Sequence, residues 1–306
     1  MPTWNPSLIS PHTWIDFSDT ATLFDATSGG SVVTNGVSIA RAEDKSGNGR
    51  NFTQGTAGSR PTWTSGVQNS LGVARYDGGD WLTSIDAASV WNFLHSGDSS
   101  IFVVNKNGTS SNPIAAYSWL GNNGTSSANR GVSFYYDDRA ITTGMTDAFN
   151  CTCTDAGSVL SYAATGTPSN NIVTDFRNVI TPNAFGLFSI NSDPGNATVA
   201  SRIKLGVNGA SLVGNNSRTG AISSNVATFS LQIGAAGNNV LPFLGDFCEL
   251  LVFESILSTE NRQLVEGYLA WKWGLQSSLP SDHPHKNSAP FYGSDRRRRH
   301  TGGYGL

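Results

Sequence analysis

Short apolar segments with a period of two residues recur along the chain, and turn-forming residues bound each of them. Side chains of a β-strand alternate between the two faces of a sheet, so this period indicates strands. Alternating examples lie at 132–136, 203–207 and 229–233, while the runs 101–104 and 243–253 are apolar on both faces. A strand that is apolar on both faces lies centrally in a two-layer packing. The pattern therefore predicts an all-β, two-sheet antiparallel sandwich.

The longest strand is expected at 243–253. Strict alternation divides its side chains into two faces, with Phe247, Leu251 and Phe253 on one and Cys248, Leu250 and Val252 on the other. The dipeptide Asn208-Gly209 follows a second alternating run, and Asn-Gly suits the positive φ angles of a tight turn. Residues 202–213 are therefore expected to form a β-hairpin.

The composition agrees with this fold class. Charged residues make up 13% of the chain, against roughly 25% in an average globular domain. Glycine occurs 34 times in 306 residues, and Ser, Thr and Asn are abundant, so turn formers outnumber helix formers. Aromatic residues at 10% argue against a disordered chain.

One helix is expected, near the C-terminus. Ser258 is a good N-cap, and apolar residues with helical spacing follow it from Leu264 to Trp271. Gly274 can adopt the left-handed conformation that ends a helix. The helix is therefore predicted over about 259–273, covering an edge or an end of the sandwich.

The net charge of -3 and the pI near 5.9 disfavour a general nucleic-acid binder. No apolar run approaches the ~20 residues of a membrane span, so no membrane partner is expected. The first residues lack the pattern of a secretory signal, which predicts a protein made without this export route or one whose signal was removed. Cys151, Cys153 and Cys248 cannot build a disulfide framework; one bridge is open, but incidental thiols are favoured.

Several sequence blocks together have a familiar form. They are WIDFSD at 14–19, DKSGNGRNFTQ at 44–54, RPTW at 60–63, ARYDGGDWL at 74–82, GDFCELLVF at 245–253, VEGYLAWKWGL at 265–275 and LPSDHPHK at 279–286. With Trp4 they bracket nearly the whole chain. This set resembles the laminin-G-like, concanavalin A-like jelly-roll domains of tailed-bacteriophage virion proteins and bacterial surface proteins.

The resemblance implies a jelly-roll sandwich of two curved antiparallel sheets over residues 1–290. It does not imply one function, because the fold hosts lectins, adhesins, hydrolases and capsid components. Relatives that hydrolyse glycosides carry acids at even spacing on one strand, so that both face a cleft. The acid pairs Asp246/Glu249, Glu249/Glu254 and Asp137/Asp138 lack that spacing, so we expect no catalysis. Glu249 is expected at an edge or paired with an arginine.

Metal binding is considered at two places. His283-Pro284-His285 could suggest a metal pair, but a solvated loop is favoured because no acid or cysteine cluster completes a zinc set. The resemblance makes calcium the better-founded ion, since related domains bind it through loop oxygens. Asp77 and Asp80 are the candidate ligands, with turn formation as the alternative. No other cofactor is expected.

Glycan binding in this fold uses an exposed aromatic ring that stacks on a sugar, and polar groups that orient it. The candidates are Trp119, Tyr135 and Asp137. Tyr135 alternates with Phe134 and Tyr136, so one of these rings is expected to face outward. The alternative for Trp119 is a place in the core.

The only strong run of like charge lies in the C-terminal tail, residues 291–306. Its basic residues are Arg296, Arg297, Arg298 and Arg299, and Tyr304 follows. A nucleic-acid arm is disfavoured because the rest of the chain is not basic. A solvated tail is the default for such a segment, and we favour a tail that docks on a neighbouring chain.

Two functional hypotheses follow. The first is a non-catalytic virion structural protein of a tailed bacteriophage, located on the capsid, collar or tail and assembled in the host cytoplasm. It would contact other virion proteins, form a symmetric homo-oligomer such as a trimer, and bind host glycans. The second is a carbohydrate-binding module of a bacterial surface protein, with a glycoside hydrolase third.

Overall fold

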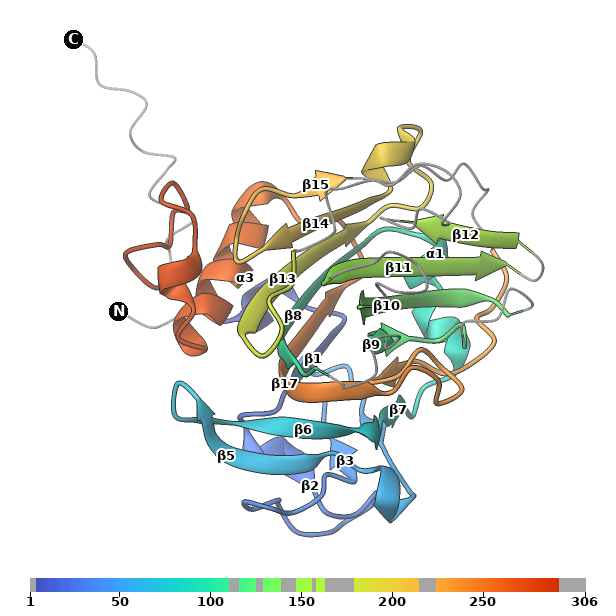
Figure 1. Ribbon diagram of the computed structural model, residues 1–306, viewed down its shortest axis with the longest axis vertical. Helices are drawn as coiled ribbons and strands as arrows, with labels where there is room; N and C mark the ends of the chain where they lie inside the picture. The colour runs from blue at the N-terminus through green and yellow to red at the C-terminus, as the bar shows by residue number, and fades with distance from the viewer. Residues whose placement is uncertain are drawn as a thin grey trace.

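The computed structural model describes residues 4–109, 116–124, 129–138, 147–155, 158–162, 179–214 and 224–291. These residues form two antiparallel sheets packed face to face (Figure 1). The sheets are the sandwich that the alternating pattern predicts, of the jelly-roll type expected from the resemblance.

The first sheet has the strand order β15-β14-β13-β8-β17-β6-β5, and β1 pairs with β17 beside β6. Its strands are β1 (Thr13–Asp16), β5 (Thr62–Gln68), β6 (Leu71–Asp80), β8 (Ser99–Asn107), β13 (Phe185–Ser192), β14 (Ile203–Val207), β15 (Val213–Gly214) and β17 (Phe243–Phe253). We call it the helix-side sheet, because the C-terminal helix packs on its outer face.

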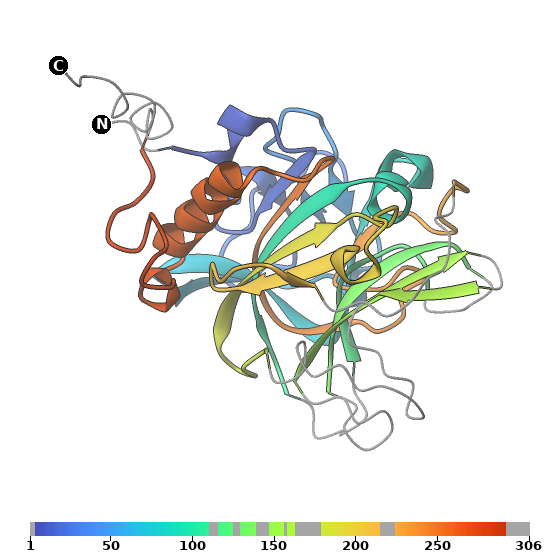
Figure 2. The ribbon, with the colours of Figure 1, turned by 90° about the horizontal axis from the view of Figure 1, so that it is seen from above.

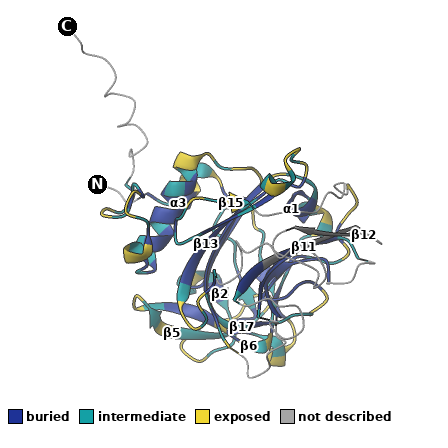
Figure 3. Ribbon diagram, turned by 45° about the horizontal axis from the view of Figure 1, so that its top comes forward, coloured by how far each residue is buried: buried dark blue, intermediate teal, exposed yellow. Residues whose placement is uncertain are grey.

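The second sheet has the order β12-β11-β10-β9-β16-β7-β4-β3-β2. Its strands are β2 (Leu23–Phe24), β3 (Arg41–Ala42), β4 (Phe52–Thr53), β7 (Leu82–Ser84), β9 (Ala116–Gly121), β10 (Gly131–Asp137), β11 (Ala148–Asp155), β12 (Ser158–Tyr162) and β16 (Gln232–Ile233). Figure 2 shows the two layers from above, and Figure 3 shows the buried residues concentrated in their strands.

Most predicted elements are confirmed. The expected strands at 101–104, 132–136 and 243–253 lie within β8, β10 and β17. The hairpin at 202–213 is β14 paired with β15, and Asn208 and Gly209 both have positive φ (51° and 76°). The run 229–233 forms only the two-residue strand β16.

The predicted faces of β17 are wrong, because the strand has a bulge between Phe247 and Glu249. At a bulge two residues oppose one on the partner strand, and the alternation shifts. Phe247 therefore lies in the core between the sheets with Leu250 and Val252. Cys248 lies on the outer side with Leu251 and Phe253, which are the residues under the helix.

The predicted helix is confirmed as α3 (Thr259–Lys272). The Ser258 hydroxyl accepts the Asn261 N–H at 3.2 Å, and Gly274 follows with φ 69°. A second, shorter helix, α1 (Phe93–Ser96), precedes β8. The apolar side of α3 packs on the outer face of the helix-side sheet and forms a second core, which contains Leu264, Val265, Leu269 and Ala270.

Candidate functional site

The predicted glycan residues lie in the second sheet and are buried. Trp119 has no exposed surface; its ring packs 4.7 Å from that of Phe188, and its Nε1 donates to Asn107 Oδ1 at 2.7 Å. It is a core residue, so its face is not available to stack on a sugar. Tyr135 and Asp137 lie on β10 and are also buried, so the expected outward-facing ring is not found there.

The predicted calcium ligands lie at the end of β6 and bond to the backbone. Asp80 Oδ2 accepts the Asp77 N–H at 3.0 Å, and Asp77 Oδ1 accepts the Gly79 N–H at 2.8 Å. Burial, together with the charge of Asp77, raises the pKa of Asp80 to about 6. These bonds correspond to the turn alternative. Among the described residues, no three His, Cys, Asp or Glu side chains gather as a metal site. Calcium binding stays a prediction.

Glu249, one of the acids considered for catalysis, accepts four hydrogen bonds. It is fully buried between β17 and α3. Its Oε1 accepts from Trp14 Nε1 at 2.7 Å and Tyr268 OH at 3.2 Å. Its Oε2 accepts from Lys272 Nζ at 2.8 Å and Trp273 Nε1 at 2.7 Å. The expected arginine partner is therefore a lysine with two indole N–H groups, and these bonds anchor the helix.

The same lysine also holds Asp16. Lys272 Nζ lies 2.7 Å from Asp16 Oδ2, and Lys45 Nζ lies 2.8 Å from the same oxygen. Burial alone raises the pKa of Asp16, but the two ammonium groups outweigh it and lower the pKa to about 2. For Glu249, burial outweighs Lys272 and raises the pKa.

A second buried carboxylate, Glu266, connects α3 to the C-terminal loop. It accepts from Ser189 Oγ at 2.7 Å and Arg262 Nη1 at 2.6 Å, and His283 Nε2 lies 3.3 Å from it. The His285 N–H donates to His283 Nδ1, so Nε2 carries the proton toward Glu266. The predicted solvated loop around these histidines is wrong, because both are buried against the helix.

The motif at 44–50 also has a structural role. Asp44 Oδ1 accepts the N–H of Trp14 at 2.8 Å and of Ser46 at 2.9 Å. Asn48 Nδ2 donates to the carbonyls of Pro11 and His12, both at 3.1 Å. The blocks that carry the family resemblance therefore hold β1, the helix and the C-terminal loop together.

A pocket opens on the helix-side sheet where the cover of α3 ends. On each of three neighbouring strands, an apolar residue lies under the helix. The next residue on the same outer face of the sheet, two positions along the strand, is polar. Val73 is followed by Arg75 on β6, Val104 by Lys106 on β8, and, across the bulge, Cys248 by Asp246 on β17. Because the strands are in register, the three polar residues form one row, with Asp246 between the two cations.

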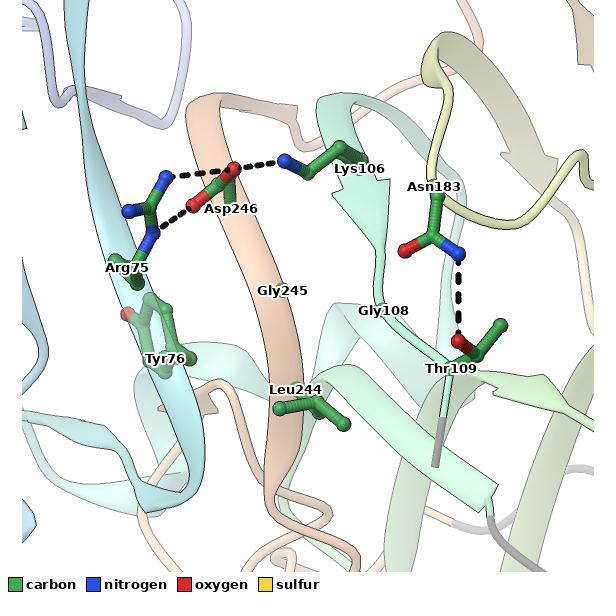
Figure 4. A pocket seen from close by; sticks show the side chains of 9 residues that line it. All are labelled: Arg75, Tyr76, Lys106, Gly108, Thr109, Asn183, Leu244, Gly245 and Asp246. Atoms are coloured by element: carbon green, nitrogen blue, oxygen red, sulfur yellow. Dashed lines mark hydrogen bonds and ion pairs between the residues drawn. The ribbon is translucent and has the colours of Figure 1, made fainter. Parts of the chain in front are cut away.

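Figure 4 shows the pocket, which has a volume of about 240 Å³ and a wide mouth. One side is the charged row. The other sides are the backbone at Gly108, the side chains of Thr109 and Asn183, and Leu244. Gly245 has φ 138°, and a Cβ there would lie 2.1 Å from the Lys106 carbonyl oxygen, so only glycine fits. The pocket offers polar groups around a small apolar patch.

Asp246 organises the charged row. It is 1% exposed. Its Oδ1 accepts Arg75 Nε at 2.7 Å, its Oδ2 accepts Arg75 Nη2 at 3.3 Å, and Lys106 Nζ pairs with Oδ2. The hydrogen bonding of the Arg75 guanidinium to Asp246 raises the pKa of Arg75. On the opposite side, Asn183 Nδ2 donates to Thr109 Oγ1 at 3.3 Å.

Sequence reasoning missed this pocket. Arg75 and Asp246 lie inside two of the motif blocks, and Lys106 is the first charge after the apolar run of β8. Each is an ordinary outward-facing residue of its own strand, and only the strand order brings them together.

The predicted docking tail lies outside the described residues, with its residues Arg296, Arg297, Arg298, Arg299 and Tyr304. Within the described part of the chain, no helix is long and apolar enough to span a bilayer.

No protein-family model and no curated protein sequence matches this chain. Among solved structures, it is similar to domain 4 of AbnA, an extracellular GH43 arabinanase of Geobacillus stearothermophilus, in complex with arabinotriose. The identity is 13%, the TM-score 0.49, and the match covers 83% of this chain and 96% of the other.

Two further similar structures are a toxin domain and a sugar-binding module. For the receptor-binding domain of botulinum neurotoxin mosaic serotype C/D, the identity is 11%, the TM-score 0.47, and the coverage 84% and 50%. For the CBM40 of Ruminococcus gnavus IT-sialidase bound to α2,3 sialyllactose, the identity is 13%, the TM-score 0.38, and the coverage 64% and 96%. At these values the similarity says nothing about the ligand of this chain.

Proposed function

We propose that this protein is a non-catalytic carbohydrate-binding domain whose site is the pocket between β6, β8 and β17. The observation that supports it is the convergence of Arg75, Lys106, Thr109 and Asn183 around Leu244 in one open pocket. A sugar ring presents hydroxyl groups at its edge and C–H groups on its face. Such a ligand needs a few fixed polar partners beside a small apolar surface.

The size and shape of the pocket agree with this class of ligand. Its volume of about 240 Å³ lies below the range of about 300–1,000 Å³ that sites for drug-sized ligands have, which suits a single sugar unit. The wide mouth leaves room for the neighbouring units of an oligosaccharide in solvent. The pocket would thus hold one unit of a longer chain.

Binding suits the local chemistry better than hydrolysis does. Three of the five acids considered for hydrolysis are held by different partners. These are Asp246 with Arg75 and Lys106, Glu249 with Lys272 and Trp273, and Glu254 with His12 at 3.2 Å. A retaining mechanism needs two carboxyls about 5–5.5 Å apart that both face the substrate. Neither the described residues nor the similar structures bear on the virion role, which stays a prediction.

The test is a glycan array followed by calorimetry on the full chain and on Thr109→Trp. The exposed Thr109 borders the pocket, so an indole there fills it without removing a charge. We expect binding of at least one oligosaccharide class by the unchanged protein and a loss of at least about tenfold in affinity for the variant.

Thr34→Trp is the matched control, because Thr34 is exposed in a loop and does not line the pocket. It should bind as the unchanged protein does. If no oligosaccharide binds, or if Thr109→Trp binds as tightly as the control, the proposed function is wrong.

A further inference from the structure

We infer that the pocket selects an acidic sugar, whose carboxylate lies against Arg75 and Lys106. This inference rests on the proposed function and specifies its ligand class. It is supported by the hydrogen bonds and ion pairs that the charged residues of the pocket already make.

Asp246, the one carboxylate among the described residues of the pocket wall, is fully engaged. Both oxygens of Asp246 receive hydrogen bonds from the two cations, and the side chain is 1% exposed. It therefore fixes the positions of Arg75 and Lys106 and is not available to accept a hydrogen bond from a sugar hydroxyl. A neutral sugar therefore cannot use the Asp246 carboxylate as a hydrogen-bond acceptor for its hydroxyl groups.

The two cations keep donors that face the solvent. Arg75 binds Asp246 through Nε and Nη2, and no described residue accepts a hydrogen bond from its Nη1. The ammonium of Lys106 has three N–H groups, and Asp246 is its only carboxylate partner among the described residues. The side chains of Arg75 and Lys106 are 48% and 25% exposed. They are held in place yet remain accessible.

The charge balance of the wall favours an anion. Among the described residues, the pocket is lined by two cations and one carboxylate. The next acid along the same face is Asp77, opposite Leu244 on the neighbouring strand, and its Oδ1 accepts the Gly79 N–H. A sugar hydroxyl and a carboxylate can both accept hydrogen bonds from these cationic donors, but only the carboxylate adds the attraction between opposite charges, so it gains more from the unused donors.

The rest of the pocket suits the sugar ring. Asn183 has a left-handed backbone (φ 59°), and its N–H donates to the Asn107 carbonyl at 2.8 Å, which fixes it at the rim. Its amide oxygen and the Thr109 hydroxyl provide the neutral partners that ring hydroxyls need. A uronic or sialic acid unit combines both features, a carboxylate and a hydroxylated ring.

The test compares acidic oligosaccharides with neutral counterparts on the full chain by calorimetry. The pairs are sialyllactose with lactose, and trigalacturonate with its methyl ester. We expect the acidic member of at least one pair to bind at least about tenfold more tightly at low salt, with the difference shrinking as ionic strength rises. Lys106→Gln should remove most of the difference, because it weakens binding of the acidic member far more than binding of the neutral member.

Lys204→Gln is the matched control, because Lys204 is a partly exposed lysine of β14 in the same sheet and does not line the pocket. It should keep the preference. If neutral and acidic members bind equally and Thr109→Trp abolishes both, the pocket binds sugars and the acidic preference is wrong. If Lys106→Gln keeps the preference for the acidic member, the sugar carboxylate does not bind to the row of Arg75, Asp246 and Lys106, and the inference is wrong. If nothing binds, the proposed function itself fails.

Discussion

At the scale of single residues, the most constrained group is the Glu249 carboxylate. It is fully buried, and both of its oxygens accept two hydrogen bonds. Because an unpaired buried charge is strongly unfavourable, the carboxylate, Lys272 and the two tryptophans stabilise the fold only as a set. Sequence alone could not assign these partners, since Trp14 lies 235 residues from Glu249 and only the fold brings the two together.

Replacing Glu249 by Gln should destabilise the protein by about 3–5 kcal/mol. The amide puts an N–H₂ donor among four donors and leaves the charge of Lys272 compensated by Asp16 alone. The free energy of unfolding in urea measures the effect. Glu43→Gln is the control, since Glu43 pairs with Arg41 at the surface, and it should lose less than about 1 kcal/mol. Equal effects of the two variants would contradict the role given to Glu249.

Asp80→Asn should stabilise the protein above pH 6. Burial and the charge of Asp77 raise the folded-state pKa of Asp80 from 3.8 to about 6. The folded state then binds the proton more tightly than the unfolded one, so the wild-type protein loses stability as the pH rises from about 4 to about 6. Asn keeps an oxygen that can accept the Asp77 N–H and has no such loss.

The expected gain is about 1–3 kcal/mol at pH 8, shrinking toward zero below pH 4. Urea unfolding of both proteins at several pH values measures it. A constant difference at every pH would mean that Asp80 acts through packing and not through its charge.

At the scale of elements, apolar periodicity predicts well where helices and strands occur. It predicts less well which face of a strand points into the core. The strands β8, β10 and β17 and the helix α3 lie where the pattern places them. The two faces of β17 exchange partners at the bulge, and α1 was not expected. The two differences have separate causes. A period of two assumes a regular pleat, while a bulge depends on the neighbouring strand; α1 has only four residues, too few to show a helical period.

Gly267→Ala in α3 should lower stability, although alanine is the better helix former. Alanine gains about 1 kcal/mol in helix propensity. A Cβ at this position would lie 2.6 Å from the Cβ of His285, which packs the C-terminal loop on the helix. Forcing these apart costs about 1–3 kcal/mol, which outweighs the gain.

Urea unfolding of Gly267→Ala and of Gln263→Ala separates the two effects, since Gln263 is a partly exposed helical position. The control should stay within about 0.5 kcal/mol of wild type. A more stable Gly267→Ala protein would show that the loop does not pack as closely as described.

At the scale of the whole molecule, the outer face of one sheet is divided between a helix and a pocket. The motif blocks secure α3 over one part through Glu249 and Glu266, and the uncovered row Arg75–Asp246–Lys106 borders it. The fold class could be predicted from the sequence, but this site could not. Its residues come from three strands that are distant in sequence, and strand order is set by the global topology.

The first and last described segments of the chain meet in a hydrogen bond. The Trp4 N–H donates to the Pro290 carbonyl at 3.3 Å, so this contact is made before the basic run begins. Deleting residues 292–306 should therefore leave the free energy of unfolding within about 0.5 kcal/mol of the full chain. The sequence predicts that Arg296–Arg299 dock on a neighbouring chain. If that chain is a second copy, the same deletion should weaken self-association in sedimentation experiments, and added salt should weaken it in the full chain. Equal self-association of both proteins at all salt concentrations would show that the tail does not dock on a second copy. A large loss of stability in the shortened protein would show that the tail belongs to the sandwich.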